Sequence, residues 1–192
     1  MGIPTPKAEE KVVYEGKILQ VVTQDMDIDG KVVTFEWARR SPGTRIIVSK
    51  GRKILLNREY RREQGKWDYR LPGGKVFDKL IEYTAFLRDG GDVLSAALDA
   101  VKKEAREEVG LEVDTLTHFA TSKNGATVEW NLYYFVADSY REIGSINHEL
   151  GEVIDVEWVD ISRVLELIKN GEFAEDRSVG VLMRYFMVNG YI

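Results

Sequence analysis

The sequence predicts an α+β protein, with a mixed β-sheet sandwiched between helices and a small antiparallel β-sheet before it at the N-terminus. Three patterns lead to this fold class. Asp29-Gly30 is a strong hairpin turn between two strand-like segments, further strands interrupted by few helices follow, and one long helical pattern covers Val93–Val109. The turn-forming residues Ser41-Pro42-Gly43 interrupt the strand pattern and mark the boundary between the N-terminal sheet and the main domain. We therefore expect an N-terminal sheet over residues 1–42 and a main domain, an α/β/α sandwich, over residues 43–192.

Strands are expected where β-branched and aromatic residues lie between turn residues. In the N-terminal part, a Glu15-Gly16 turn divides the strand-forming stretch Lys11–Val22, and the Asp29-Gly30 turn joins Gln24–Ile28 to Lys31–Arg39. We expect the first two strands of the main part to pair with each other. The strands expected in the main part are Arg45–Ser49, Lys53–Arg58, Trp67–Arg70, Leu116–Ala120, Glu129–Ala137 and Val153–Trp158.

Helices are expected where apolar residues recur every three to four positions. The longest, Val93–Val109, follows Asp92, which suits an N-cap, and precedes Gly110, which suits the position after a C-cap. Another is expected over Phe77–Arg88. Two more helices are expected near the C-terminus, over Ile161–Lys169 and Val179–Val188.

Composition limits the function classes. A chain of 192 residues can hold one sizeable domain with a small appendage, and its net charge of −5 argues against nucleic-acid binding through a basic surface. The absence of cysteine excludes disulfides and thiolate chemistry. We find no signal-peptide pattern and no apolar run approaching the roughly 18 residues of a membrane span, so we expect a cytoplasmic protein without a membrane partner.

Three carboxylates, Glu104, Glu107 and Glu108, fall in the segment KKEAREEVGL at residues 102–111. Their i, i+3, i+4 spacing brings them to one edge of a helix, with Glu108 directed into the apolar stripe. A carboxylate on a core-facing side costs stability unless a cation or strong donors meet it. A divalent metal with hard oxygen ligands would offset this cost. From the residues alone, the alternative is a solvated acidic face.

The segment Leu71–Lys75 precedes this helix, and the pair LPGGK … KEAREEVGL resembles the signature of the Nudix hydrolases. The resemblance implies an enzyme that cleaves nucleoside diphosphates linked to another group, with Mg²⁺, or alternatively Mn²⁺, held by the three glutamates and the Gly73 carbonyl. This sequence departs from the family pattern in three places. Lys103 stands at the arginine position, Ser95 stands where the first glutamate belongs, and an insertion at about residues 76–90 precedes the helix.

The resemblance covers most of the chain and points to one branch of the family. In the ADP-ribose pyrophosphatase branch, the N-terminal sheet is exchanged between two subunits and helps to build the nucleotide site. The resemblance therefore implies a domain-swapped homodimer. The segments that are similar to this branch are Lys11–Lys17, Leu55–Arg61, Val156–Asp160 and Ile168–Glu172.

The same similarity implies roles for residues that bind the substrate. Phe35 would stack on the adenine, Glu36 and Arg40 would contact the nucleoside, and Arg61 would contact the diphosphate. The alternative for Phe35 is packing within its strand, on the face that it shares with Trp37.

Hydrolysis also needs cationic groups that bind the diphosphate and a base that activates the attacking water. Arg58 joins Arg61 as a candidate phosphate ligand, because a forked guanidinium suits phosphate. The branch carries its catalytic glutamate in a polar loop before a strand, and residues 147–152 form such a stretch here. Glu152 fits best as the catalytic base and Glu149 second, whereas an ordinary acidic loop is the alternative.

Together these patterns predict a Nudix diphosphatase that splits ADP-ribose into AMP and ribose 5-phosphate. One alternative is a hydrolase of another nucleotide sugar such as GDP-mannose. The other is a non-catalytic nucleotide-sensing module, since the signature lacks one glutamate. Retention of Glu104, Glu107 and Glu108 favours the enzyme. The insertion lies between the Gly-Gly turn and the glutamate helix, so it is expected to act as a lid or as an interface.

Overall fold

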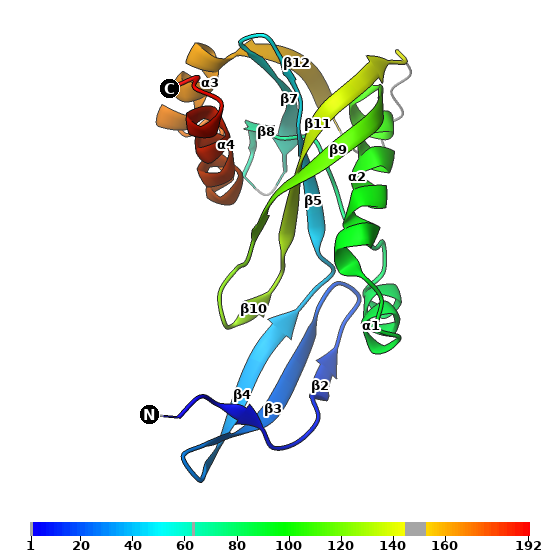
Figure 1. Ribbon diagram of the computed structural model, residues 1–192, viewed down its shortest axis with the longest axis vertical. Helices are drawn as coiled ribbons and strands as arrows, with labels where there is room; N and C mark the ends of the chain where they lie inside the picture. Colours follow the sequence, from blue (N-terminus) through cyan, green and yellow to red (C-terminus); the bar gives the residue numbers. More distant parts are fainter. Residues whose placement is uncertain (1, 63, 145–152) are drawn as a thin grey trace. The chain divides into compact units, whose positions relative to one another are not determined.

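The computed structural model of the chain describes residues 2–62, 64–144 and 153–192 (Figure 1). The chain forms two compact units. Unit 1 joins the N-terminal segment to the insertion and to a third segment, whereas unit 2 holds the remainder. Unit 1 consists of Met1–Pro42, Phe77–Asp92 and Lys123–Asn131, and unit 2 consists of Gly43–Val76, Val93–Ser122 and Leu132–Ile192.

Unit 1 is a small sheet with one helix. Its central hairpin pairs Gln20 with Arg39 at one end and Ile28 with Lys31 at the other. Asp29 and Gly30 both have positive φ, as a tight hairpin turn requires, which confirms the predicted hairpin. The strand order is β1-β3-β4-β10, and β2 also pairs with β3. The elements are β1 (Thr5–Pro6), β2 (Lys11–Glu15), β3 (Gln20–Ile28), β4 (Lys31–Arg39), β10 (Val128–Glu129) and α1 (Leu80–Arg88).

Unit 2 contains two sheets, one mixed and one antiparallel. One has the order β5-β11-β9, in which β11 runs parallel to β5 and antiparallel to β9. The other has the order β12-β7-β6, and β8 also pairs with β7. Its strands are β5 (Gly43–Ile47), β6 (Ser49–Lys50), β7 (Lys53–Arg61), β8 (Lys66–Arg70), β9 (Leu111–Ser122), β11 (Leu132–Glu142) and β12 (Ile154–Asp160).

The expected pairing of Arg45–Ser49 with Lys53–Arg58 is largely wrong. Of the predicted strand Arg45–Ser49, only its last residue, Ser49 in β6, pairs with β7. The preceding strand β5 is buried along its whole length and pairs with β11 on one edge. Its other edge binds the Gly-Gly segment, because the Thr44 and Ile46 N–H groups donate to the carbonyls of Gly74 and Pro72 at 2.9 Å each. Hydrogen bonding on both edges leaves β5 no place beside β7.

Helices cover both faces of unit 2 (Figure 1). Helix α2 (Val93–Val109) lies on one side of the sheets, and α3 (Ile161–Lys169) and α4 (Asp176–Val188) lie on the other. The predicted bounds of α2 and α3 are confirmed, whereas α1 begins later and α4 earlier than expected. The buried stripe of α2 packs with apolar residues of β5 and β11. This core includes Ile46, Val48, Ala97, Val101, Ala105, Val109 and Phe135.

The predicted strand Glu129–Ala137 is in fact two strands in different units. Its first residue belongs to β10, which pairs with β4 in unit 1. Trp130 and Asn131 lie in no strand, and the residues from Leu132 onward lie in β11 of unit 2. Asn131 and Leu132 mark the passage between the units. A continuous apolar pattern does not reveal such a change of sheet, because both strands use the same residue types.

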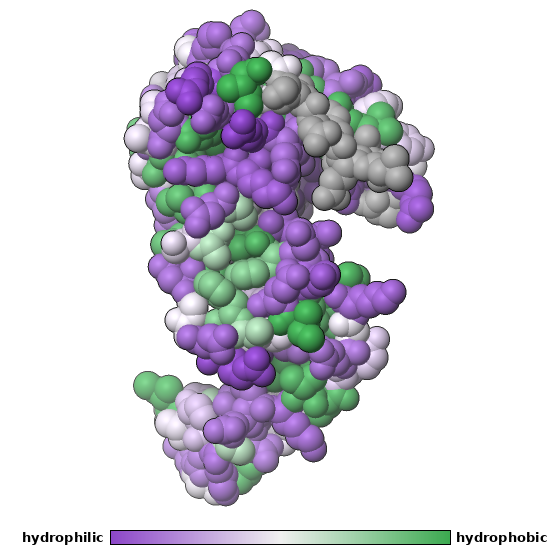
Figure 2. Space-filling model, turned by 90° about the vertical axis from the view of Figure 1, so that its right-hand side faces the viewer, coloured by the Kyte–Doolittle hydropathy of each residue, from purple (hydrophilic) through white to green (hydrophobic). Residues whose placement is uncertain are grey.

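The hydropathy of the surface differs between the two units. Figure 2 views the side on which α2 lies in Figure 1, and the upper part of this view is mainly hydrophilic. The sheet of unit 1, in contrast, leaves apolar side chains exposed. These are Val12, Val13, Tyr14, Val32 and Val33. Within the described residues, we find no helix that is both long enough and apolar enough to cross a membrane.

Candidate active site

The Gly-Gly turn is held against α2 and β5 through the backbone of Gly73. Its N–H donates to Glu108 Oε2 at 2.8 Å, and its carbonyl accepts from Arg45 Nη1 at 3.1 Å. Gly73 has a φ of 138°, and a Cβ there would overlap the Thr44 carbonyl oxygen. Only glycine fits this position.

The second glycine permits a close approach of a carboxylate. A Cβ on Gly74 would overlap the carboxylate of Glu104, which therefore lies directly against the turn. Glu104 and Glu108 thus meet the same two glycines from one helix. The structure thus brings two of the predicted metal ligands, Glu104 and Glu108, to the Gly-Gly turn, and their binding of a metal stays a prediction.

The surroundings of Glu108 make its ionisation costly. Burial raises the pKa of Glu108 to about 8, and the nearby charge of Glu104 adds to the rise. The Gly73 N–H, the Arg45 charge and the Asn57 side chain oppose it, and Asn57 Nδ2 donates to Glu108 Oε2 at 2.9 Å. Burial, assisted by the Glu104 charge, therefore outweighs these three groups, and the net shift is upward.

The donor set around Glu108 suits a hard divalent cation. Asn57 Oδ1 is buried and has no hydrogen-bond partner among the described residues. Carboxylate, amide and backbone carbonyl oxygens are the ligands that Mg²⁺ and Ca²⁺ prefer. Glu104, Glu108 and Asn57 supply such oxygens beside the Gly73 carbonyl, so the residues present fit a divalent ion.

Glu107 is arranged differently from the other two glutamates. Its carboxylate pairs with Lys103 Nζ at 3.7 Å, one helical turn away, and its side chain is 40% exposed. Across the part of the chain that the structure describes, we find no group of three or more His, Cys, Asp or Glu side chains placed to hold a metal ion. Full convergence of the three predicted ligands would therefore require Glu107 to leave Lys103.

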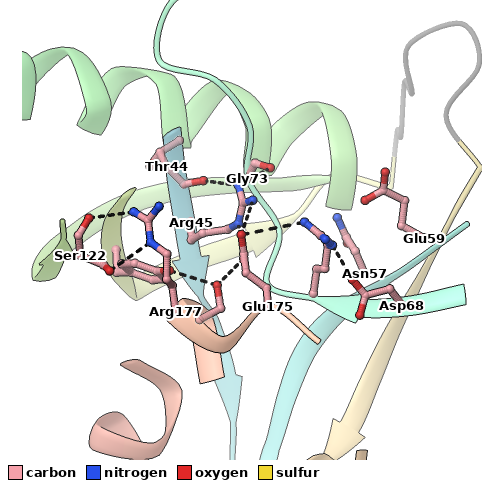
Figure 3. A network of polar contacts seen from close by, with 12 residues as sticks. Thr44, Arg45, Asn57, Glu59, Asp68, Gly73, Ser122, Glu175 and Arg177 are labelled. Atoms are coloured by element: carbon pink, nitrogen blue, oxygen red, sulfur yellow. Dashed lines mark hydrogen bonds and ion pairs between the residues drawn. The ribbon is translucent and has the colours of Figure 1, made fainter. Parts of the chain in front are cut away.

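Arg45 anchors the turn to a buried network of charges (Figure 3). Its guanidinium donates to the Thr44 carbonyl at 2.9 Å and to both oxygens of Glu175, at 3.2 and 3.3 Å. Burial lowers the pKa of Arg45, but the charge of Glu175 outweighs it and the net shift is upward. Burial likewise raises the pKa of Glu175, yet Arg45 and Ser178 bring it below the ordinary value. Both groups are therefore ionised at neutral pH.

The network continues to the start of α4. Arg70 lies 3.9 Å from Glu175 and pairs with the fully buried Asp68 at 2.7 Å. The other oxygen of Asp68 accepts from the Ala174 N–H at 2.9 Å. Strand β8, strand β5 and the start of α4 are thereby joined through side-chain ion pairs and hydrogen bonds, and the Gly-Gly turn is attached to this network through Arg45.

The candidate phosphate-binding arginines lie on β7 and have partners. Arg58 packs over the Trp67 ring at 4.6 Å and lies 3.7 Å from Asp155. Arg61 pairs with Glu59 at 2.7 Å. Each would have to exchange a carboxylate for a phosphate to bind substrate.

The candidate nucleoside residues lie in unit 1, which contains a pocket of about 420 Å³. Phe35 lines this pocket and is 42% exposed, so it is available for stacking. Glu36 alternates to the other face of β4 and is exposed. Arg40 packs over the Trp130 ring at 4.2 Å. Residues that line the pocket include Gln24, Met26, Phe35, Trp37, Glu129 and Asn131.

The two candidate bases, Glu149 and Glu152, lie outside the described residues, so their predicted role stays a prediction.

Comparison with known families agrees with this geometry. A model of the NUDIX domain matches residues 39–179, which is most of the chain. The chain belongs to the Nudix family. The predicted family is therefore confirmed, together with the α+β fold and the assignment as a Nudix diphosphatase.

Two curated relatives align over most of this Nudix chain. A CMP-5'-(N-acetyl-N-hydroxy-3-aminopropyl)phosphonate hydrolase of Streptomyces rubellomurinus (strain ATCC 31215) is 27% identical over 165 residues, covering 84% of this chain and 72% of the relative. A GDP-mannose pyrophosphatase of Enterobacter sp. (strain 638) is 29% identical over 184 residues. This alignment covers 90% of this chain and 89% of the relative. The crystal structure of an ADP compounds hydrolase superposes with a TM-score of 0.69 at 18% identity, covering 100% of this chain and 98% of that one. This structural likeness shows a shared fold.

Sequence reasoning missed several residues of this Nudix site. Asn57 lies in Leu55–Arg61, a segment that is similar to the family, but the sequence patterns do not predict its contact with Glu108. Arg45 stands within the apolar strand GTRIIV, and a charge in a buried strand signals a buried partner. That partner, Glu175, lies 130 residues further along the chain, and no local pattern connects them.

The Arg45–Glu175 pair gives a first prediction. Arg45→Met should lower the free energy of unfolding by about 3–5 kcal/mol, because it leaves Glu175 buried without its directly bonded cation, with Arg70 remaining at 3.9 Å. Combining it with Glu175→Leu should cost less than Arg45→Met alone, since no unpaired charge remains. Chemical denaturation measures both values.

The control is Arg141→Met, which breaks an exposed pair with Glu112 and should change stability little. A double variant as unstable as the sum of the two single variants would contradict the role of this pair as a coupled buried unit.

Proposed function

We propose that this Nudix hydrolase cleaves the diphosphate bond of a nucleoside diphosphate sugar, with ADP-ribose as the first candidate, giving AMP and ribose 5-phosphate. The observation that carries the proposal is the placement of Glu104 and Glu108 against the Gly73-Gly74 turn. This arrangement offers hard oxygen ligands beside a backbone that a phosphate can approach closely.

The proposed cofactor is Mg²⁺, with Mn²⁺ as the alternative, held by Glu104, Glu107, Glu108 and the Gly73 carbonyl. When bound, the ion would polarise the diphosphate and lower the pKa of an attacking water. Asn57 fixes one oxygen of Glu108 and leaves its own Oδ1 available. The carbonyl of Gly73 has a second lone pair beside the bond from Arg45.

The chain's own side chains would complete the reaction. Arg58 and Arg61 would bind the phosphate groups after exchanging their carboxylate partners, which suits their forked guanidinium groups. A glutamate that is not a metal ligand would take the proton of the attacking water. We propose Glu152 for this role, with Glu149 as the alternative.

The pocket of unit 1 is proposed as the nucleoside site. Its volume of about 420 Å³ lies within the usual range of small-molecule sites. Phe35 would stack on the base, and Glu36 and Arg40 would contact the rest of the nucleoside. A guanine nucleotide sugar such as GDP-mannose is the second candidate, favoured by the similarity to a GDP-mannose pyrophosphatase over 90% of the chain.

A second copy of the chain is the proposed partner. The sheet of unit 1 exposes Val12, Val13, Tyr14, Val32 and Val33 on its strands, and a small sheet with such a surface is stabilised by further packing. An exchange of this sheet between two subunits would cover these residues. The cytoplasmic location also stays a prediction.

The metal ligands and the substrate can be tested together. ADP-ribose and GDP-mannose are offered with Mg²⁺, and phosphate is measured after coupling to a phosphatase, which attacks the monophosphate products but not the substrates. Glu107→Gln and Glu108→Gln should each abolish turnover, because each removes a charge that neutralises the metal. Without metal their stability should be unchanged or slightly higher, since like charges are crowded there.

Glu166→Gln, on the surface of α3 and paired only with Arg163 among the ion pairs described, is the matched control and should keep full activity. Undiminished turnover in both Glu107→Gln and Glu108→Gln would return the cluster to an ordinary acidic face.

The base is tested by comparing substitutions at the two candidate residues. Glu152→Gln should lower kcat by about 10²- to 10⁴-fold with little change in KM, the range typical of a lost general base. Glu149→Gln should be milder. If Glu149→Gln is the severe variant, the two roles are exchanged; if both are mild, the base lies elsewhere.

The homodimer is tested by removing residues 1–40. Because the exposed sheet would be exchanged between subunits, the truncated protein should lose substrate binding or aggregate, while the full chain should have the mass of a dimer by light scattering. An active, monodisperse truncated monomer would refute this proposal.

A further inference from the structure

The carboxylate of Glu129 collects hydrogen bonds from three side chains of unit 1. Oε2 accepts from Trp37 Nε1 at 3.1 Å and from Arg39 Nε at 2.8 Å. Oε1 accepts from the Tyr83 hydroxyl at 3.3 Å. Three segments that are distant in sequence, namely β4, the insertion and β10, therefore meet at one side chain.

This contact sets the position of one wall of the pocket. Trp37 and Glu129 both line the pocket, on the same side of β4 as Phe35. An indole has one donor, and in Trp37 that donor is bound to Glu129. This hydrogen bond restrains the side-chain torsion angles of Trp37. Rotating the ring would break the bond and remove one donor from the partly buried carboxylate of Glu129.

The inserted helix α1 contributes to the hold through Tyr83. This side chain is only 5% exposed, and its ring lies 5.4 Å from Phe77. Phe77 is in turn fastened to the N-terminal segment, because its N–H donates to Ser41 Oγ at 3.2 Å and its carbonyl accepts from the same hydroxyl at 2.9 Å. The insertion is therefore packed into unit 1 as a support.

Arg39 pairs its positive charge with the carboxylate of Glu129. It bridges Glu129 and Glu10, with a distance of 2.9 Å to the latter, and lies 5.9 Å from the centre of the Trp37 ring. Burial lowers the pKa of Arg39, but the two carboxylates outweigh it and raise the pKa overall. Arg39 therefore places a positive charge beside the carboxylate that accepts from Trp37 and Tyr83, and its charge-assisted hydrogen bond helps to hold that carboxylate in place.

We propose that Glu129 is a positioning residue of the pocket, which holds Trp37 against the base of the nucleotide, and that Tyr83 of the insertion completes this hold. The proposal rests on the proposed function in that the pocket receives a nucleoside. It assigns the insertion a role in substrate affinity. The expected consequence is that α1 affects KM and leaves the chemical step unchanged.

The first test needs no substrate. Tyr83→Phe removes only the hydroxyl, so Trp37 should become more mobile and its fluorescence more accessible to acrylamide. The signal of Trp37 is isolated as the difference between each protein and the same protein carrying Trp37→Phe. Tyr140→Phe is the matched control, since it deletes a hydroxyl bonded to the Ser49 carbonyl in unit 2 and should not alter this signal.

The second test measures kinetics with ADP-ribose and GDP-mannose. Tyr83→Phe should raise KM about two- to tenfold, the range expected for one lost hydrogen bond, and leave kcat unchanged, since base binding is the same in the ground and transition states. In a Trp37→Phe background, Tyr83→Phe should have no further effect on KM, because the ring that it helps to hold no longer donates. Glu129→Gln provides a second variant with an altered carboxylate.

The outcomes separate this proposal from the proposed function. Unchanged KM and unchanged quenching in folded Tyr83→Phe and Glu129→Gln would overturn the positioning role, as would additive effects of Trp37→Phe and Tyr83→Phe. If the wild type cleaves neither substrate, the proposed function fails, and the quenching of Trp37 still decides whether the hold exists. Melting temperatures and circular dichroism establish that each variant is folded.

Discussion

The backbone of Gly73 is the point on which the candidate active site of unit 2 depends. Its N–H is bound to Glu108 of α2 and its carbonyl to Arg45 of β5, so the helix, the turn and the strand are fixed to one another through a single residue. A φ of 138° and the nearby Thr44 carbonyl exclude any side chain there. The first glycine of the Nudix signature is therefore required by geometry, and the second lets the Glu104 carboxylate approach the turn closely.

The charges around this residue are arranged in two layers. Arg45, Glu175, Arg70 and Asp68 form a buried set in which each charge has an opposite partner. Beside it lie the carboxylates of Glu104 and Glu108, and burial together with the Glu104 charge raises the pKa of Glu108 against the opposing charge of Arg45. A buried pair that is complete stabilises a fixed geometry, whereas an incomplete set favours the binding of a cation. The first layer thus positions the second.

Local signals in the sequence predicted local structure well. The bounds of α2 and α3 follow from apolar periodicity, and the hairpin at Asp29-Gly30 follows from turn chemistry. Long-range features could not be read in the same way. The pairing of β5 with β11 and the hydrogen bonds between Arg45 and Glu175 join segments that are distant in sequence. The residues next to each segment do not indicate which distant segment it contacts. For the same reason the similarity to the family suggested glutamate ligands but gave no role to Asn57 or Glu129.

The insertion shows why the two halves of the signature tolerate separation in sequence. The chain leaves unit 2 after Val76 and returns to it at Val93, and the intervening segment belongs to unit 1. Glu104 and Glu108 nevertheless meet Gly73 and Gly74, because the contact is maintained by hydrogen bonds and packing within unit 2. Chain length between the turn and the helix is therefore free to vary, since loop closure becomes only slowly more costly with length. The added residues could then take on a second task in unit 1, where Tyr83 bonds to Glu129 at the wall of the pocket.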